Sequence, residues 1–358
     1  MNTLPYNVEI FNRNYELLQH YNVDSVDYKF DYMSLSETVI CIPFTNNVSI
    51  GDYIRVQNDS HEFSGYITRL SVDETLEGFT NVAFKPFLGL FDVDVMFTVA
   101  DQGSDPLEDT LSDYIKAYFV NNSDTSQNIY GLEVETISST ASWTFFLEES
   151  EQGTGKTIIN LLSVIRSALT KYNVAVYITP NFETKKLHVE IGDKQLSSFT
   201  IEADLPSVIK RAVTVNENKS DVNKLIVYAQ SNMTTSQIYY LHPDGTYDTT
   251  NSNRITPVIY EIQTVSVSGS QTFVGEAQKA ADKLFGNNKK ENLIEITIQQ
   301  DNKMVNPDDL EIGQAVTVIT NGKAYVSIFT GYEIKDVTKL IFGTIRLDLT
   351  KILKEAIK

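Results

Sequence analysis

The sequence contains very little cysteine and no long hydrophobic run, and both absences narrow the class of protein. Only Cys41 is a cysteine among the 358 residues, so no internal disulfide can form and nothing indicates an oxidising compartment. Nowhere do about 18 apolar residues follow one another, and the N-terminus lacks a basic region followed by an apolar segment. We expect neither a membrane span nor a signal peptide, and a small core-filling role for Cys41.

Positive charge is also scarce, because 29 Lys and Arg residues face 47 Asp and Glu residues and give a formal net charge of -18. A phosphate backbone held at close range would be repelled rather than neutralised. This argues against tight nucleic-acid binding. The acidic residues are scattered along the chain, which is typical of a soluble surface, although an acidic lumen that lets DNA slide past stays open as an alternative.

Hydrophobic residues make up 42% of the chain and aromatic residues 11%, which is ample material for packed cores. Short strand patterns dominate residues 8–98 and return after residue 213, and helical spacing occurs in residues 107–118, 161–169 and 276–285. We predict an α+β, mainly β fold with two related β-barrel domains and an α/β insertion. The expected parts are an N-terminal β-barrel hub domain (1–100), an α/β domain (101–205), a second β-barrel domain with one helix (206–346) and a C-terminal helix (347–358).

Residues 153–157 read GTGKT and raise the question of a nucleotide-binding P-loop. A Walker A motif needs a glycine five positions before Gly155, but Ser150 stands there, and no later strand ends in a magnesium-binding aspartate. We interpret the stretch as turn and helix chemistry, with Thr154 capping a helix that starts near Gly155 and a buried stripe that begins at Ile158. No cofactor is predicted.

Other signs of catalysis or metal binding are weak. The four histidines are far apart in sequence and no serine lies in a GxSxG elbow. We therefore predict that the protein is not an enzyme and assign no catalytic, cofactor-binding or metal-ligating residue. The carboxylate pairs that a polysaccharide hydrolase would need are Asp92 and Asp94, Glu148 and Glu149, and Asp308 and Asp309.

Two alternative functions stay open from these residues. A cell-wall polysaccharide hydrolase would require two carboxylates that face each other across a groove. A carbohydrate-binding module would require exposed aromatic side chains, for which Trp143, Tyr239 and Tyr240 are candidates. Burial of these aromatics within their strands is equally compatible with the pattern.

The most informative pattern is a repeat. IGDYIRVQNDSHEFSGYI (50–67) and IGQAVTVITNGKAYVSIFTGYEI (312–334) both contain Ile-Gly, an alternating strand, a polar turn, an aromatic residue and Gly-Tyr. The repeated positions are Gly51 and Gly65 in the first copy and Gly313 and Gly331 in the second. The two glycine spacings are 14 and 18 residues, which predicts a second hairpin four residues longer.

Four tyrosines lie beside the repeated glycines and are candidates for the barrel core or for an interface. They are Tyr53, Tyr66, Tyr325 and Tyr332. Two similar barrels per chain also have a geometric consequence, because three copies around a threefold axis would present six barrels. Such a ring could dock on a sixfold tube.

The layout resembles the tail-hub, or tail-associated, baseplate proteins of long-tailed bacteriophages, which are related to the hub of contractile-phage baseplates. The stretches that carry the resemblance are VEIFNRNYELL, the SIGDYIRV hairpin, GKTIINLLSVIRSALTKYNVAVYI, and the closing DLEIGQAVTVITNGKAYVSIFTGYEI and KLIFGTIRLDLTKILKEAIK. The resemblance implies a homotrimer that caps the tail tube, docks on a hexameric distal tail protein and opens for DNA ejection. It also implies a place in the virion, at the tail tip.

Further partners follow from the same resemblance. A tape-measure protein and a receptor-binding protein would lie nearby, and the chain would be a short member of the family without a fibre or wall-degrading domain. Adsorption specificity would then belong to the separate receptor-binding protein.

Overall fold

The fold is known from a computed structural model of residues 1–358. The described residues are 5–43, 47–59, 61–72, 78–98, 105–140, 143, 156–215, 222–242, 247–252, 254, 258–267, 272–285, 292–299, 305, 309–344 and 346. They divide into two compact units. Unit 1 comprises residues 1–196, 299–313 and 330–340, and unit 2 comprises residues 197–298, 314–329 and 341–358.

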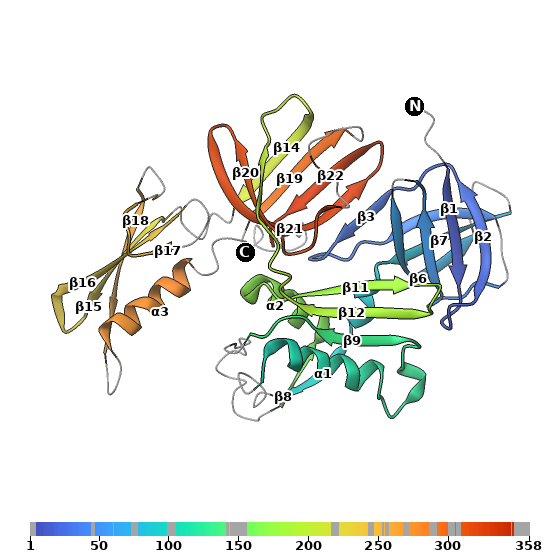
Figure 1. The fold of residues 1–358 in the computed structure, drawn as a ribbon, viewed down its shortest axis with the longest axis horizontal. Coiled ribbons are helices and arrows are strands. Elements are labelled where there is room, and N and C mark those ends of the chain that lie inside the picture. The colour runs from blue at the N-terminus through green and yellow to red at the C-terminus, as the bar shows by residue number, and fades with distance from the viewer. Residues whose placement is uncertain are drawn as a thin grey trace, which may run out of the picture. The chain divides into compact units, whose positions relative to one another are not determined.

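The N-terminal part of unit 1 is a six-stranded antiparallel sheet that curls around a hydrophobic core (Figure 1). Its strand order is β2-β1-β5-β6-β7-β4, so neighbours in the sheet are often distant in sequence. Alternate residues of β1 and β4 are buried, as expected for strands with one face on a core. The strands are β1 (Tyr6–Phe11), β2 (Leu17–Val23), β4 (Thr38–Pro43), β5 (Tyr53–Gln57), β6 (Glu62–Val72) and β7 (Phe79–Lys85).

A late segment of the chain completes this core. Strand β3 (Tyr28–Asp31) pairs antiparallel with the last residues of β21 (Lys323–Ile334), and Gly331 lies opposite Asp31. Ile334 is buried in the same cluster as the apolar residues of β1 and β5. The first and last thirds of the sequence therefore share one core.

Two small sheets and two helices make up the α/β part of unit 1. Strand β10 pairs with β8, and β11, β12 and β9 form a sheet in which β12 and β9 run parallel. The elements are a 3₁₀ turn (Phe87–Phe91), β8 (Asp94–Thr98), α1 (Leu107–Phe119), a 3₁₀ turn (Thr125–Gln127), β9 (Leu132–Thr136), β10 (Lys156–Asn160), α2 (Leu161–Tyr172), β11 (Ala175–Asn181) and β12 (Lys186–Gly192).

Helix α2 begins later than the GTGKT stretch predicts. Its N-cap is Asn160, whose Oδ1 accepts from the backbone N–H of Ser163 at 3.1 Å. Lys156–Asn160 instead form β10, and Ile158 is 73% exposed, so the expected helix start near Gly155 and the buried stripe from Ile158 are wrong. The prediction failed because the pairing of β10 with β8 satisfies backbone groups that a longer helix would use. Thr154 and Gly155 themselves lie outside the described residues.

The end of α2 is formed by Asn173. Asn173 has φ +60° in the left-handed region, and its N–H bonds back to the last turn of the helix. The buried residues of α2 follow the helical spacing predicted for residues 161–169. Tyr32 then joins this helix to the N-terminal part, because its carbonyl accepts from Arg166 at 3.0 Å and its hydroxyl accepts from the Val176 N–H at 2.9 Å.

In one sheet of unit 2, β13 runs parallel to β20, β20 pairs antiparallel with β21, and β14 pairs antiparallel with β19. The first half of β21, up to Phe329, contributes to this sheet within unit 2. Val316, Val318, Ile294 and Ile296 alternate toward its buried side. The remaining strands of this sheet in unit 2 are β13 (Phe199–Glu202), β14 (Val208–Val215), β19 (Asn292–Gln299) and β20 (Ala315–Thr320). Strand β22 (Val337–Phe342) has its residues up to Leu340 in unit 1.

A second sheet of unit 2 has the order β17-β16-β15-β18 and carries α3 along one face (Figure 1). Leu225 and Val227 of β15 pack with Ala277, Ala281 and Phe285 of the helix. The small alanines let the helix lie close to the sheet. The elements are β15 (Lys224–Ala229), β16 (Asn232–Leu241), β17 (Tyr247–Asp248), β18 (Tyr260–Val265) and α3 (Phe273–Phe285).

The predicted fold class, α+β and mainly β, is confirmed, since sheets make up most of the described elements around three α-helices. The domain boundaries near residues 100, 205 and 346 stay a prediction, and the C-terminal helix expected at 347–358 lies outside the described residues. Among the residues that the structure describes, no helix is both long and apolar enough to cross a bilayer.

Candidate functional site

The first repeated hairpin begins at Gly51, which has φ +91°. Its N–H donates to the Ile67 carbonyl at 2.8 Å, and the carbonyl of Asp52 accepts from the Ile67 N–H at 2.8 Å. Two residues of one strand thus face one residue of the other, which is a β-bulge. A positive φ of this size favours glycine because a Cβ would crowd the backbone.

The second repeated hairpin begins in the same way. Gly313 has φ +85°, and the carbonyl of Gln314 accepts from the Phe329 N–H at 2.9 Å. In both hairpins the residue after the glycine is bonded to a residue 15 positions later, Asp52 to Ile67 and Gln314 to Phe329. Gly51 and Gly313 therefore occupy equivalent backbone positions.

The second glycine of each copy does not occupy an equivalent position. Gly65 lies inside its hairpin, opposite Ile54, whereas Gly331 lies beyond Phe329 and pairs with Asp31 of β3. The prediction of a hairpin four residues longer is therefore wrong. The second copy has longer strands and a two-residue turn at Asn321 and Gly322, and its Gly-Tyr pair sits further along β21.

Gly65 and Gly331 nevertheless meet the same steric demand. A Cβ on Gly65 would overlap the carbonyl oxygen of Lys85 in β7, and a Cβ on Gly331 would overlap the carbonyl oxygen of Phe30 in β3. Each glycine thus allows close approach of a neighbouring strand.

The four tyrosines beside these glycines lie in different surroundings. Tyr53 is 3% exposed and lies opposite Tyr66, which is half-buried, so the structure brings these two together. Burial raises the pKa of both hydroxyls to about 12. Tyr332 packs against the N-terminal core with its ring 5.9 Å from that of Tyr28, and the half-buried Tyr325 lies opposite Val318.

The aromatic platform required by a carbohydrate-binding module is not present at the candidate residues. Trp143, Tyr239 and Tyr240 are 3%, 2% and 9% exposed. Trp143 donates its indole N–H to the Asp105 carbonyl at 2.6 Å, and Tyr239 belongs to the core beneath α3. That interpretation of the three residues is wrong because each ring is used in packing.

Of the candidate carboxylates of a hydrolase, the structure describes Asp92, Asp94 and Asp309. Asp92 accepts from the Asn160 side chain at 3.0 Å, and Asp94 lies opposite Asn160 in the β8–β10 ladder. Glu148, Glu149 and Asp308 lie outside the described residues. Within the described ranges, no group of three or more His, Cys, Asp or Glu residues is placed to hold a metal ion. Cys41 is half-buried in β4 and forms no disulfide.

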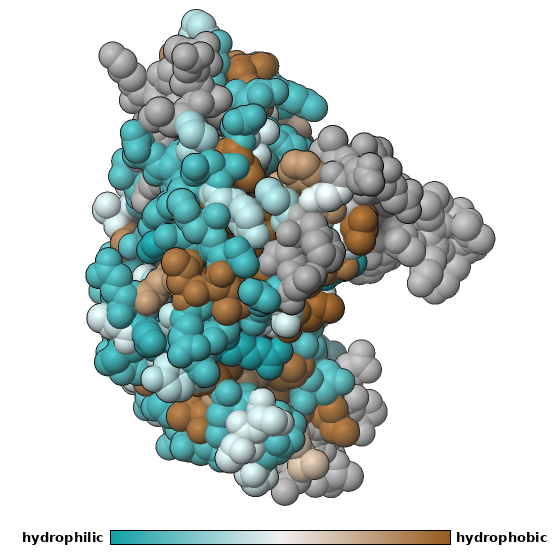
Figure 2. Space-filling model, turned by 90° about the vertical axis from the view of Figure 1, so that its right-hand side faces the viewer, coloured by the Kyte–Doolittle hydropathy of each residue, from teal (hydrophilic) through white to brown (hydrophobic). Residues whose placement is uncertain are grey.

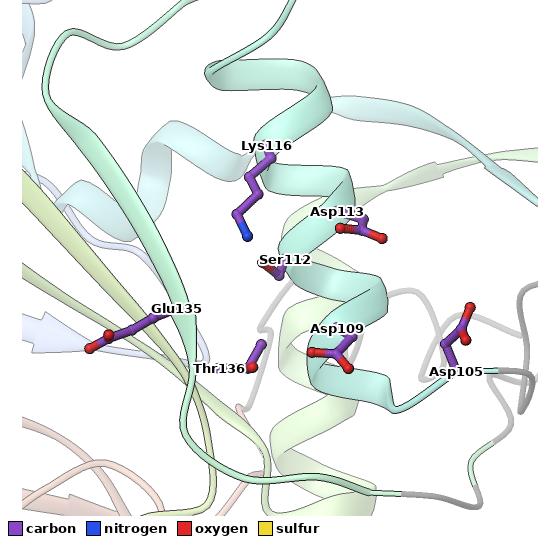
Figure 3. A pocket seen from close by; sticks show the side chains of 7 residues that line it. All are labelled: Asp105, Asp109, Ser112, Asp113, Lys116, Glu135 and Thr136. Atoms are coloured by element: carbon purple, nitrogen blue, oxygen red, sulfur yellow. The ribbon is translucent and has the colours of Figure 1, made fainter.

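A groove of about 620 Å³ runs between α1 and β9 within unit 1. Figure 3 shows Ser112 and Lys116 on the side of α1 that faces β9, with Thr136 across from them, while Glu135 points to the other side of the strand. The lining residues are Asp105, Asp109, Ser112, Asp113, Lys116, Glu135 and Thr136.

A buried carboxylate fixes one end of this groove. Glu108 is fully buried in the first turn of α1 and accepts from the Thr140 N–H at 2.8 Å and from the hydroxyls of Ser138 and Thr140 at 2.5 and 3.0 Å. A carboxylate at a helix N-terminus is favoured by the positive end of the helix dipole. The segment after β9 is thereby held against α1.

This groove is not evident from the local sequence. The spacing of Asp105, Asp109 and Asp113 by four residues was a signal, since such residues neighbour one another along a helix. The burial of Ser112 beside them depends on how β9 packs on α1, which the local sequence does not indicate.

On the face in Figure 2, hydrophilic residues predominate and hydrophobic residues form small separate groups. In the N-terminal sheet the exposed large hydrophobic residues include Leu17, Val39 and Val72, at 55%, 48% and 66% exposure. Single exposed residues of this kind are normal on protein surfaces.

No protein-family model and no curated protein matches this sequence, but solved structures do. The 43 kDa tail protein of prophage MuSo2 from Shewanella oneidensis has a TM-score of 0.50 at 12% identity, covering 95% of this chain and 98% of that one. The tail protein from Neisseria meningitidis MC58 has a TM-score of 0.48 at 13% identity, covering 95% and 96%. Prophage tail protein gp18 from Listeria monocytogenes EGD-e has a TM-score of 0.48 at 12% identity, covering 97% of both chains.

The likeness to the Shewanella prophage protein extends over nearly the whole of both chains, so it concerns the complete arrangement of elements rather than one sheet. At this level of identity it defines the fold. The chain has the fold of a phage tail protein, and the resemblance predicted from the sequence is confirmed at that level.

Proposed function

We propose that the protein is a structural baseplate hub at the tip of a phage tail and works by assembly rather than by chemistry. In this proposal it forms a homotrimer, caps the tail tube, docks on a hexameric distal tail protein and opens for DNA ejection. It acts within the virion, near the tape-measure and receptor-binding proteins. The fold shared with a prophage tail protein supports the proposal.

The observation that carries the trimer is the repeated hairpin start. Gly51 and Gly313 each open a hairpin with a positive φ, and in both hairpins the bonded residues are 15 positions apart. Two similar β elements per chain become six when three chains surround an axis. A sixfold partner would then meet chemically similar surfaces at every position.

The acidic balance fits the same role. The net charge is -18, and a negatively charged passage would repel the phosphate backbone and let DNA leave without sticking. This part of the proposal requires acidic side chains to line the passage of the assembled particle.

The test is the absolute mass of the purified protein, measured by light scattering over a range of concentrations, alone and with the distal tail protein of the same phage. We expect a particle of three chains of 40.3 kDa each, either alone or only with the partner. A monomer at every concentration that ignores the partner would overturn the proposal. Cleared zones in a cell-wall zymogram would overturn the non-enzymatic role alone.

A further inference from the structure

The groove between α1 and β9 combines unpaired carboxylates with a buried polar atom that has no partner. Among the described residues, the groove carboxylates Asp105, Asp109 and Asp113 form no ion pair. Asp109 and Asp113 are one helical turn apart, where two like charges repel and destabilise the helix.

Neighbouring carboxylates of the same unit are paired. Glu133 of β9 forms ion pairs with Lys186 at 2.5 Å and His188 at 3.2 Å, and Lys194 lies 3.2 Å from Glu190 and 2.7 Å from Glu311. The groove differs from these positions, because Lys116 is the only cationic residue among its described lining residues.

Ser112 is the second observation and is independent of the first. Its side chain is 2% exposed and lines the groove, yet its hydroxyl oxygen has no hydrogen-bond partner. Buried hydroxyls are nearly always bonded, because losing water without a replacement costs free energy. Figure 3 shows this side chain directed toward the space between α1 and β9.

One kind of ligand would relieve both features. Ammonium and guanidinium groups carry positive charge and several donors, so they can bond a serine oxygen and a carboxylate at the same time. The charge of the groove also changes along its length. Aspartates lie toward the start of α1, and Lys116 lies in its last turn. A segment with basic side chains at one end and a carbonyl or carboxylate at the other would match this order.

We propose that the α1–β9 groove binds an extended, lysine- or arginine-bearing segment of a partner protein. The volume of about 620 Å³ suits several residues rather than a single ion, and no metal-holding cluster lies within the described ranges. A nucleic acid would be repelled by the acidic lining. The inference does not depend on the trimeric hub, since all lining residues belong to unit 1 of one chain.

The test uses the full chain and an acetylated, amidated tri-lysine peptide as the probe, with binding followed by calorimetry at low and at physiological salt. A tri-glutamine peptide of the same length is the uncharged control. The groove variant is Asp109→Asn with Asp113→Asn. Its matched control is Asp24→Asn with Glu183→Gln, which removes the same charge from exposed positions elsewhere in unit 1.

We expect the groove variant to weaken tri-lysine binding by about fivefold or more and the control variant to change it less than twofold. If both variants weaken tri-lysine binding equally, the peptide is attracted to the acidic chain in general, and the proposed binding site in the groove is overturned. The absence of tri-lysine binding to the natural chain would overturn it as well.

Ser112→Ala separates binding from folding. Because it removes a buried hydroxyl without a partner, we expect the melting temperature to stay the same or to rise by about 2 °C, while tri-lysine binding weakens. Ser112→Thr keeps an oxygen at the site and serves as the conservative variant that should retain part of the binding. Unchanged binding in Ser112→Ala would exclude the hydroxyl from the site.

Discussion

The two repeated hairpins start alike and continue differently. Both begin at a glycine with a positive φ, and both bond the next residue to one 15 positions later. In the β5–β6 hairpin, four residues lie between the last paired residues Gln57 and Glu62. In the β20–β21 hairpin, only Asn321 and Gly322 intervene.

The difference shows what a glycine in a strand pattern reports. Gly51 and Gly313 meet a demand of the backbone at the start of each hairpin, so they coincide in the two copies. Gly65 and Gly331 meet a demand of the strand that lies against them, β7 in one case and β3 in the other. A similar motif therefore marks similar steric needs without fixing the register.

The largest expected effects come from adding a methyl group at the close-approach glycines. Gly65→Ala and Gly331→Ala should each lower the free energy of unfolding by about 3 kcal/mol, because the blocking atom is a backbone carbonyl that cannot swing aside. Urea denaturation followed by circular dichroism measures the loss, with the half-buried Ser64→Ala on the same strand as control. A free energy of unfolding equal to that of the unsubstituted chain, in either variant, would show that the neighbouring strand can move.

Alanine at the glycines that start the two hairpins should lower the free energy of unfolding by less than alanine at Gly65 or Gly331. Gly51→Ala and Gly313→Ala impose a positive φ on a residue with a Cβ, which costs about 1 to 2 kcal/mol. The extra contacts are with the flexible Arg13 guanidinium at one site and with a Leu169 methyl, 3.2 Å away, at the other. Similar losses in the same denaturation experiment would support equivalent positions, whereas a loss at only one site would contradict them.

The turns of the two hairpins should be stabilised by different features, a side-chain hydrogen bond in the first and a glycine with a positive φ in the second. Asn58→Ala removes the bond from the His61 N–H to the Asn58 side chain, 2.8 Å long, and should cost about 1 kcal/mol, while Asn58→Asp should recover most of it. Gly322→Ala should cost about 1 kcal/mol through its φ of +71°, with open space around it, and Gly322→Asn should recover most of that. Failure of either rescue would contradict the assigned cause.

The smallest effect concerns pH and the first hairpin. Burial raises the folded-state pKa of Tyr53 to about 12 from an ordinary value of 10.0, so the stabilisation is complete below pH 10 and is lost as pH rises toward 12. Between pH 8 and pH 10 the ionisation of this group should lower the free energy of unfolding by about 0.4 kcal/mol. Urea midpoints at the two pH values should differ less for Tyr53→Phe than for the natural chain, and an equal difference would contradict the assignment.

Some elements could be predicted because their signals are local. Asn173 ends α2 where the sequence places a residue tolerant of the left-handed region, and the alternating runs after residue 213 became β15, β16, β19 and β20. The start of α2 could not be predicted, because the β10–β8 pairing joins residues about 60 positions apart. Asn160, rather than Thr154, became the cap.

The groove could not be predicted from the sequence for the same reason. The acidic residues of α1 were visible in the sequence, but the burial of Ser112 depends on β9 and on the clamp that Glu108 makes with Ser138 and Thr140. These contacts join residues about 30 positions apart. A single sequence does not show which distant segment will cover a helix face.

The sequence by itself determined that this protein is acidic, folded, mainly β and built around repeated Ile-Gly hairpins, because composition, strand alternation and glycine conformation act within a few residues. Only the tertiary structure decided the partners of Gly65 and Gly331, the exposure of Ile158 and the burial of Trp143 and Ser112. Those outcomes depend on pairing and packing between distant segments, where the free energy belongs to the whole core rather than to any local run of residues.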